Sequence, residues 1–139
     1  MAITTLSPKF SLGAFLPNVK ILSAKVDEII NYTNGTLGIV TQLTSITTGI
    51  TTNSTKGVIT TVPLTTAAST VAGPFVVTNS KVKSNSVINV TIEYANGKTG
   101  FPVVLAEAVT NGSFNIRLLN ASTLAALNDV VKIHFQVIN

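Results

Sequence analysis

Side chains that commonly perform acid–base chemistry are few in this chain. It has one histidine, His134, and its carboxylates are Asp27, Glu28, Glu93, Glu107 and Asp129. A Ser-His-Asp triad would require an aspartate beside His134. Asp129 lies five residues before it in a predicted strand, and an odd separation places two strand side chains on opposite faces. The sequence therefore predicts a solvated or interface histidine.

A pair of carboxylates across one cleft would indicate glycoside hydrolysis. Glu93 and Glu107 are the candidates, since adjacent strands could make them neighbours, but their spacing does not require it. Surface or intersubunit ion pairing is the interpretation that we favour. The chain has no cysteine, no dense cluster of zinc or calcium ligands and no glycine-rich phosphate loop. We therefore expect a non-enzymatic protein that uses no metal and no cofactor.

The charge pattern restricts the partners. Charged residues make up 10% of the chain, and the formal net charge of +4 comes from nine scattered basic residues, of which Arg117 is the one arginine. Nucleic-acid binders usually cluster such residues on one face, and only Lys81 and Lys83 stand close together in the β-rich part, so we expect no nucleic-acid partner. No apolar run reaches the ~18–20 residues of a membrane span, and the N-terminus lacks the features of a signal peptide. Abundant Thr, Ser and Asn suit a surface that is covered by neighbours in an assembly.

The positioning elements in residues 36–139 are predicted to be strands. Short runs rich in Val, Ile and Thr alternate with Asn, Gly, Ser and Pro, and Ile88, Val90, Ile92 and Tyr94 share one face of the clearest run. Ser122 to Asn128 is predicted to form a single helical turn. The predicted strands are 37–42, 45–51, 57–62, 74–79, 86–95, 101–109, 113–119 and 130–138. This pattern predicts an all-β fold, an eight-stranded antiparallel β-sandwich with a jelly-roll-like topology.

Residues 18–35 have a different period. Val19, Leu22, Val26 and Ile29 recur with spacings of three, four and three, the a/d pattern of a coiled coil, and Asn34-Gly35 is a typical helix end. Two heptads are marginal alone, so the β-domain would have to hold the partner helices together. The alternatives are a short trimeric coiled-coil stub and a single amphipathic helix packed on its own β-domain, and the sequence prefers the stub.

Residues 1–17 contain two helix-breaking prolines and several apolar side chains. One interpretation is a disordered tail. The other, which Phe10, Phe15 and Leu16 favour, is an extended anchor that orders when it docks on another protein. The predicted organisation is therefore an anchor over 1–17, a helix over 18–35 and a β-sandwich over 36–139.

Several runs of the β-rich part carry a resemblance by their order. They are VTQLTSITTGIT at 40–51, GVITTV at 57–62, FVVTNS at 75–80, GSFNI at 112–116, AALN at 125–128 and IHF at 133–135. In this order they resemble short virus-encoded structural proteins, chiefly of tailed phages, that are described as capsid-associated, head-fibre or decoration proteins. The likeness covers Gly38 to Asn139, and Lys20 to Asn34 resembles the short helix that often precedes this domain.

The resemblance implies a homotrimeric β-sandwich on the capsid surface of a virion, made in the host cytoplasm. Its partners would be two further copies of itself and, through the N-terminus, the major capsid protein or another virion protein. It carries over no catalytic residue. Met1 to Pro17 have no counterpart in these proteins, so the resemblance does not indicate which virion protein this segment would bind.

A carbohydrate-binding or adhesin module, of the tail-fibre or receptor-binding type, is the alternative. Its partner would be a host surface glycan. Sugar platforms usually expose Trp or Tyr. The chain has no Trp, and its two tyrosines, Tyr32 and Tyr94, are assigned to the helix and to an inward strand face. The sequence therefore favours the virion protein.

Overall fold

The computed structural model describes residues 36–139, which form one compact unit. The predicted helix and anchor, with Val19, Leu22, Val26, Ile29, Phe10, Phe15 and Leu16, lie outside the described residues. Residues 36–139 contain eight strands and no helix. The strands are β1 (Gly38–Thr41), β2 (Ile50–Thr51), β3 (Lys56–Thr60), β4 (Val71–Thr78), β5 (Val87–Glu93), β6 (Pro102–Thr110), β7 (Ser113–Asn120) and β8 (Lys132–Ile138).

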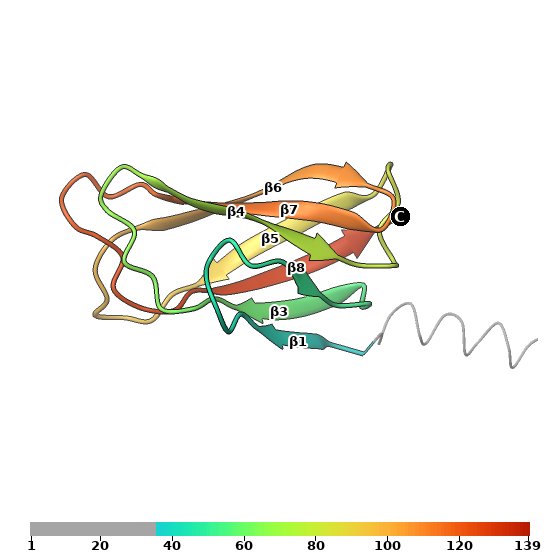
Figure 1. Cartoon of the computed structure of the whole chain (residues 1–139), viewed down its shortest axis with the longest axis horizontal. Helices are drawn as coiled ribbons and strands as arrows, with labels where there is room; N and C mark the ends of the chain where they lie inside the picture. Colours follow the sequence, from blue (N-terminus) through green and yellow to red (C-terminus); the bar gives the residue numbers. More distant parts are fainter. Residues whose placement is uncertain (1–35) are drawn as a thin grey trace, which may run out of the picture. The chain divides into compact units, whose positions relative to one another are not determined.

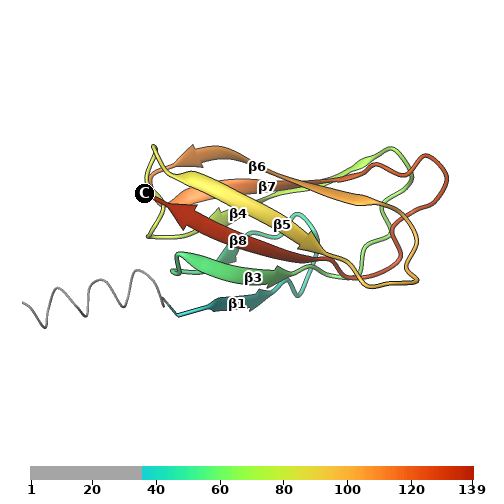
Figure 2. The ribbon, with the colours of Figure 1, turned by 180° about the vertical axis from the view of Figure 1, so that it is seen from behind.

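The strands form two sheets that face each other as the layers of a sandwich (Figures 1 and 2). One sheet has the order β1-β3-β8-β5 and the other the order β2-β4-β7-β6. The all-β fold with eight strands is confirmed. We name the outward surfaces of these layers the first and the second outer face.

Both sheets are mixed, so the prediction of a purely antiparallel sandwich is wrong. β1 pairs with β3 and β2 pairs with β4 in parallel, whereas the other pairs are antiparallel. The reason is the path of the first half of the chain, in which β1 to β4 alternate between the two sheets. β3 therefore runs parallel to β1 in one sheet, and β4 runs parallel to β2 in the other. These parallel pairs differ from the antiparallel pairs of a jelly roll.

The predicted strand over 45–51 is shortened to Ile50–Thr51. The residues before it form a turn, in which the amide of Thr48 donates to the carbonyl of Ser45 over 3.1 Å and the Ser45 hydroxyl contacts the hydroxyls of Thr47 and Thr48. Hydroxyl side chains often divert the backbone from a ladder in this way.

The predicted helical turn over 122–128 is also wrong. The Ser122 hydroxyl accepts from the amides of Leu124 and Ala125, and the amide of Leu127 donates to the carbonyl of Thr66 over 2.9 Å. Because the amide of Leu127 is bonded to a distant loop, the segment cannot close an i→i−4 helical ladder.

The core lies between the sheets and follows the predicted alternation. Phe114, Ile116 and Leu118 of β7 are buried, as are Ile133 and the other inward residues of β8. The rings of Phe114 and Phe135 meet across the two layers with centroids 6.0 Å apart.

Residues 36–139 include no helix of the length and apolarity that a membrane crossing requires.

Candidate functional site

His134 lies on the first outer face, in an ion-pair network. Its Nε2 atom is 3.1 Å from Oε2 of Glu93, and Nζ of Lys132 donates to Oε1 of the same carboxylate over 2.8 Å. Asp129 belongs to a different pair, with its Oδ2 atom 2.7 Å from Nζ of Lys98. His134 and Asp129 thus have separate partners, and no triad is assembled from them.

The network keeps Glu93 ionised. The hydrogen bonds from Lys132 and His134 hold the pKa of Glu93 below its usual value of 4.5. A general acid at neutral pH needs the opposite shift, because it must still carry its proton. The arrangement therefore suits an exposed ion pair and not proton transfer.

Glu93 and Glu107 are on different sheets, so they are not neighbours across a cleft. Glu107 accepts two hydrogen bonds through Oε1 from Arg117, over 3.0 Å from Nε and 2.7 Å from Nη2. Within the described range, His, Asp and Glu side chains form no group of three that could hold a metal ion. Ion pairing of these carboxylates within one chain is what the geometry supports.

A groove of about 350 Å³ crosses the first outer face. Gly57 and the Phe135 ring form part of its lining, and a Cβ on Gly57 would overlap that ring. Position 57 therefore requires glycine, because any side chain there would collide with the Phe135 ring and the carbonyl of Gly38. Its other lining residues are Leu37, Lys56, Asn89, Thr91, His134 and Gln136.

The amides in this groove differ from the structural amides of the fold. Asn79 and Asn120 are fully buried, and their side chains bond to backbone partners. The side chains of Asn89 and Gln136, which are cross-strand partners on β5 and β8, make no hydrogen bond to any described residue. Their donors and acceptors are available to a polar ligand. From the sequence, strand alternation predicted that both residues face outward, but it did not indicate that they line a groove.

Part of the second outer face is apolar, and sequence reasoning missed it. Val71, Leu119 and Val103 form one row across β4, β7 and β6, because Leu119 is the register partner of both valines. All three are partly exposed. With Phe101 and Leu105 on the β6 side they form a surface that we call the apolar face, made of Val71, Phe101, Val103, Leu105 and Leu119.

A signal for the apolar face exists in the sequence. Residues 101–106 read FPVVLA, an apolar run without alternation. Phe101, Val103 and Leu105 are exposed, whereas Val104 and Ala106 pack against the core. A strand that is apolar on both sides is typical of one that is covered on both sides.

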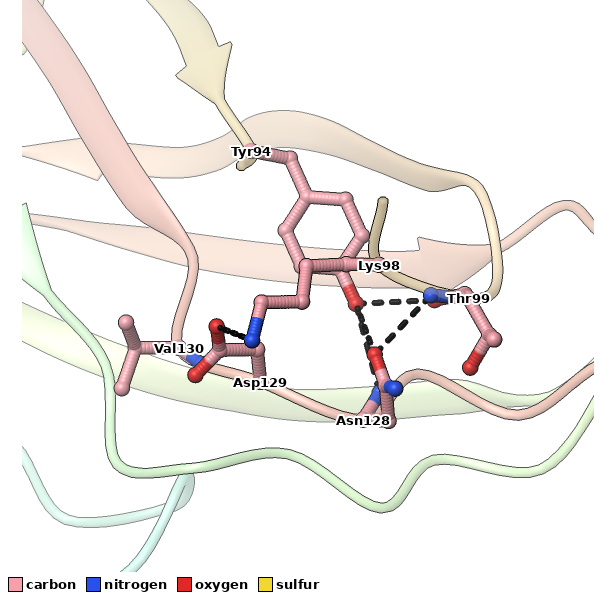
Figure 3. A network of polar contacts seen from close by, with 6 residues as sticks. All are labelled: Tyr94, Lys98, Thr99, Asn128, Asp129 and Val130. Atoms are coloured by element: carbon pink, nitrogen blue, oxygen red, sulfur yellow. Dashed lines mark hydrogen bonds and ion pairs between the residues drawn. The ribbon is translucent and has the colours of Figure 1, made fainter. Parts of the chain in front are cut away.

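The loops at one end of the sandwich are tied together by side chains (Figure 3). The Tyr94 hydroxyl donates to the carbonyl of Thr99 over 2.8 Å and accepts from the amide of Asn128 over 3.2 Å. Oδ1 of Asn128 in turn accepts from the amide of Thr99 over 2.9 Å, beside the Lys98–Asp129 ion pair. Tyr94 also packs against the core, so its ring and its hydroxyl both stabilise the fold.

The arrangement thus offers two unlike surfaces on opposite layers, a polar groove and an apolar face. No family model, no curated protein and no solved structure matches this chain.

Proposed function

We propose that this chain is a non-enzymatic structural protein of a virion, a homotrimeric capsid decoration or head-fibre protein that docks through its N-terminal segment. The apolar face is the observation that supports this best. Contiguous exposed apolar surface on a folded protein generally marks an interaction site. Interfaces between permanently associated chains are also the more apolar ones.

The ionisable groups support a structural role as well. The described carboxylates stand in ion pairs with Arg117, Lys98 or the pair Lys132 and His134. None of these described carboxylates is buried away from a partner in the manner of a tuned catalytic acid. Their geometry stabilises strands and loops.

Three copies would bring three N-termini to one end of a cyclic assembly. The helix residues Val19, Leu22, Val26 and Ile29 would form the stub, and Phe10, Phe15 and Leu16 would bind the capsid or another virion protein. Simultaneous docking of three weak anchors raises the overall affinity, because the second and third events are intramolecular.

The first test is the absolute mass of the full chain in solution, by light scattering after size exclusion. We expect three times the 14.5 kDa of one chain. A Leu22→Asp, Ile29→Asp double variant should weaken the assembly if the helices form a stub. Unchanged mass and stability in that variant would exclude the stub, and a monomeric wild-type chain would exclude the trimer.

The virion location has its own test, which is mass spectrometry of purified particles from the source lysate. Peptides of this chain should remain with the major capsid protein through density purification. Particles that contain the major capsid protein but lose this chain under gentle conditions would contradict the location.

The polar groove favours a second candidate function, binding of a surface glycan. The amides of Asn89 and Gln136 and the hydroxyl of Thr91 could bond to sugar hydroxyls. A glycan array tests this, with an Asn89→Ala, Gln136→Ala double variant and an Asn96→Ala control in an exposed loop. A signal that survives in the double variant would contradict the groove as a sugar site.

A further inference from the structure

We propose that the apolar face is the surface through which copies of this chain bind one another. This inference rests on the proposed function and names the interface of that assembly. The partner it commits to is a second copy of the chain, placed against β4, β7 and β6.

The exposure of the face is high at its β6 side. Phe101 is 64% exposed and Leu105 is 55% exposed. Burial of such side chains provides about 25 cal/mol per Å² of apolar surface removed from water. In a lone domain these side chains would stay in water, so association that covers them is favourable.

The face is already ordered before any partner arrives. Its side chains stand on three hydrogen-bonded strands or, in the case of Phe101, directly before β6. The amide of Phe101 donates to Oδ1 of the buried Asn120 over 3.0 Å, and the carbonyl of Phe101 accepts from the amide of Ala121 over 2.8 Å. Preorganisation lowers the entropy that binding must overcome.

Charge favours a second copy as the partner. Along β4, β7 and β6 the only ionisable side chains are those of Arg117, opposite Leu105, and Glu107, which pair with each other at 2.7 Å. The surface is therefore neutral, although cations outnumber carboxylates elsewhere in residues 36–139. Two copies can approach through this face without the like-charge repulsion that their other surfaces would create, and a strongly charged partner would find no complementary field.

The central residue of the face provides a matched test. Leu119→Glu introduces a carboxylate into the row of Val71, Leu119 and Val103, and Leu124→Glu makes the same change at a loop residue that is 94% exposed. Both variants have the same composition and net charge. By light scattering we expect Leu119→Glu to weaken the assembly at least tenfold and Leu124→Glu to leave it at the wild-type mass.

Folding is controlled separately, by circular dichroism and by a gentler variant, Leu105→Ser. This variant removes apolar surface without adding a charge opposite Arg117, and it should weaken the assembly while keeping the β-sheet spectrum. If wild type is trimeric and both face variants stay trimeric, the inference is wrong and the proposed function stands. If wild type is monomeric, the proposed assembly itself fails.

A crosslinking experiment then identifies what covers the face. The chain has no cysteine, so Leu105→Cys provides a single reactive thiol and Leu124→Cys a matched control. A short bis-maleimide should join two copies in the Leu105→Cys variant and not in the Leu124→Cys variant. A monomeric Leu105→Cys chain whose introduced thiol is protected from maleimide would instead show that another segment of the same chain covers the face, which overturns the inference.

Discussion

At the scale of single residues, buried asparagines hold the ends of this sandwich. Oδ1 of Asn120 accepts from the amides of Phe101 and Ser122, and its Nδ2 donates to carbonyls of Thr66, Ala67 and Ala125. Asn79 also bonds to a loop through its side chain, since its Nδ2 donates to the carbonyl of Ser54 over 2.7 Å. One side-chain amide thereby provides hydrogen-bond partners to backbone groups of irregular loops, which have no strand ladder to pair with.

Replacement of Asn120 should be costly, because three part-buried backbone groups lose their partner, namely the amides of Phe101 and Ser122 and the carbonyl of Ala125. We expect Asn120→Ala to lower the free energy of unfolding by about 2–4 kcal/mol, since each unsatisfied buried group costs ~1–3 kcal/mol. Urea denaturation at fixed protein concentration measures this, with Asn96→Ala as an exposed control. A loss equal to that of the control would show that Asn120 does not hold the loops.

The pH dependence of stability also originates in single residues. Hydrogen bonds from Lys132 and His134 lower the pKa of Glu93, and the hydrogen bond from Lys98 lowers the pKa of Asp129. A carboxylate whose pKa is lower in the folded state stabilises the fold above its unfolded pKa. That contribution is lost as the pH falls through the folded value.

We therefore expect stability to decrease on acidification below about pH 4.5, where Glu93 would titrate when unfolded. Glu93→Gln should reduce the acid slope and leave the slope near neutrality unchanged. At alkaline pH the relevant group is Lys98, whose pKa is raised above 10.5 by Asp129. The contribution of this ion pair to stability is lost as the pH rises through the raised pKa. Thermal melts from acid to neutral pH check the acid limb, and an unaltered slope in Glu93→Gln would refute it.

Sequence reasoning succeeded for residues whose role depends on their own strand. The inward positions of β7 and β8 followed from alternation alone. The partners of Asn120 did not, because Thr66 and Ala67 lie 54 and 53 positions away and only the fold brings them near. Local pattern carries no information about such a contact.

At the scale of elements, the connection between β5 and β6 depends on two glycines with the same backbone requirement but different surroundings. Gly97 and Gly100 have φ values of 79° and 84°. A Cβ on Gly97 would meet nothing within 4 Å, whereas one on Gly100 would lie 2.6 Å from Cδ2 and 3.0 Å from the amide nitrogen of Leu127.

This pair separates backbone strain from packing. Gly97→Ala should lower stability by about 1–2 kcal/mol, the cost of a left-handed conformation for an L-residue. Gly100→Ala should cost that amount plus ~1–3 kcal/mol for overpacking against Leu127. Equal losses in urea denaturation would mean that Leu127 moves aside freely.

Element direction was the part of the fold that the sequence did not predict. Alternation reports which face a residue occupies, and it is the same in parallel and antiparallel pairs. The parallel pairs β1–β3 and β2–β4 arise because consecutive strands change sheet, and a tertiary path of this kind leaves no periodic signal.

At the scale of the whole molecule, the two outer faces divide the proposed roles. The first carries the ion pairs of Glu93 and the groove with the amides of Asn89 and Gln136, and the second carries the apolar face. Composition indicated only that charge is scarce. The division between the faces emerged from strand register, since Val71 and Val103 are remote in sequence and meet on either side of Leu119.

Assembly through a neutral apolar face has a thermodynamic signature. Because association binds the folded chain and not the unfolded one, the melting temperature should rise with protein concentration. The rise should change little between low and high salt, since surface charges, which salt screens, contribute little to this contact. An interface made of Lys and Glu pairs would instead weaken as salt increases.

Calorimetry of the full chain over a wide range of concentration measures this, at low and at high salt. Leu119→Glu should remove most of the concentration dependence, and Leu124→Glu should retain it. A melting temperature that is independent of concentration in wild type would mean that no dissociation accompanies unfolding. A rise that persists in Leu119→Glu would place the contact on another surface, so the slope of melting temperature against concentration separates assembly from the location of its interface.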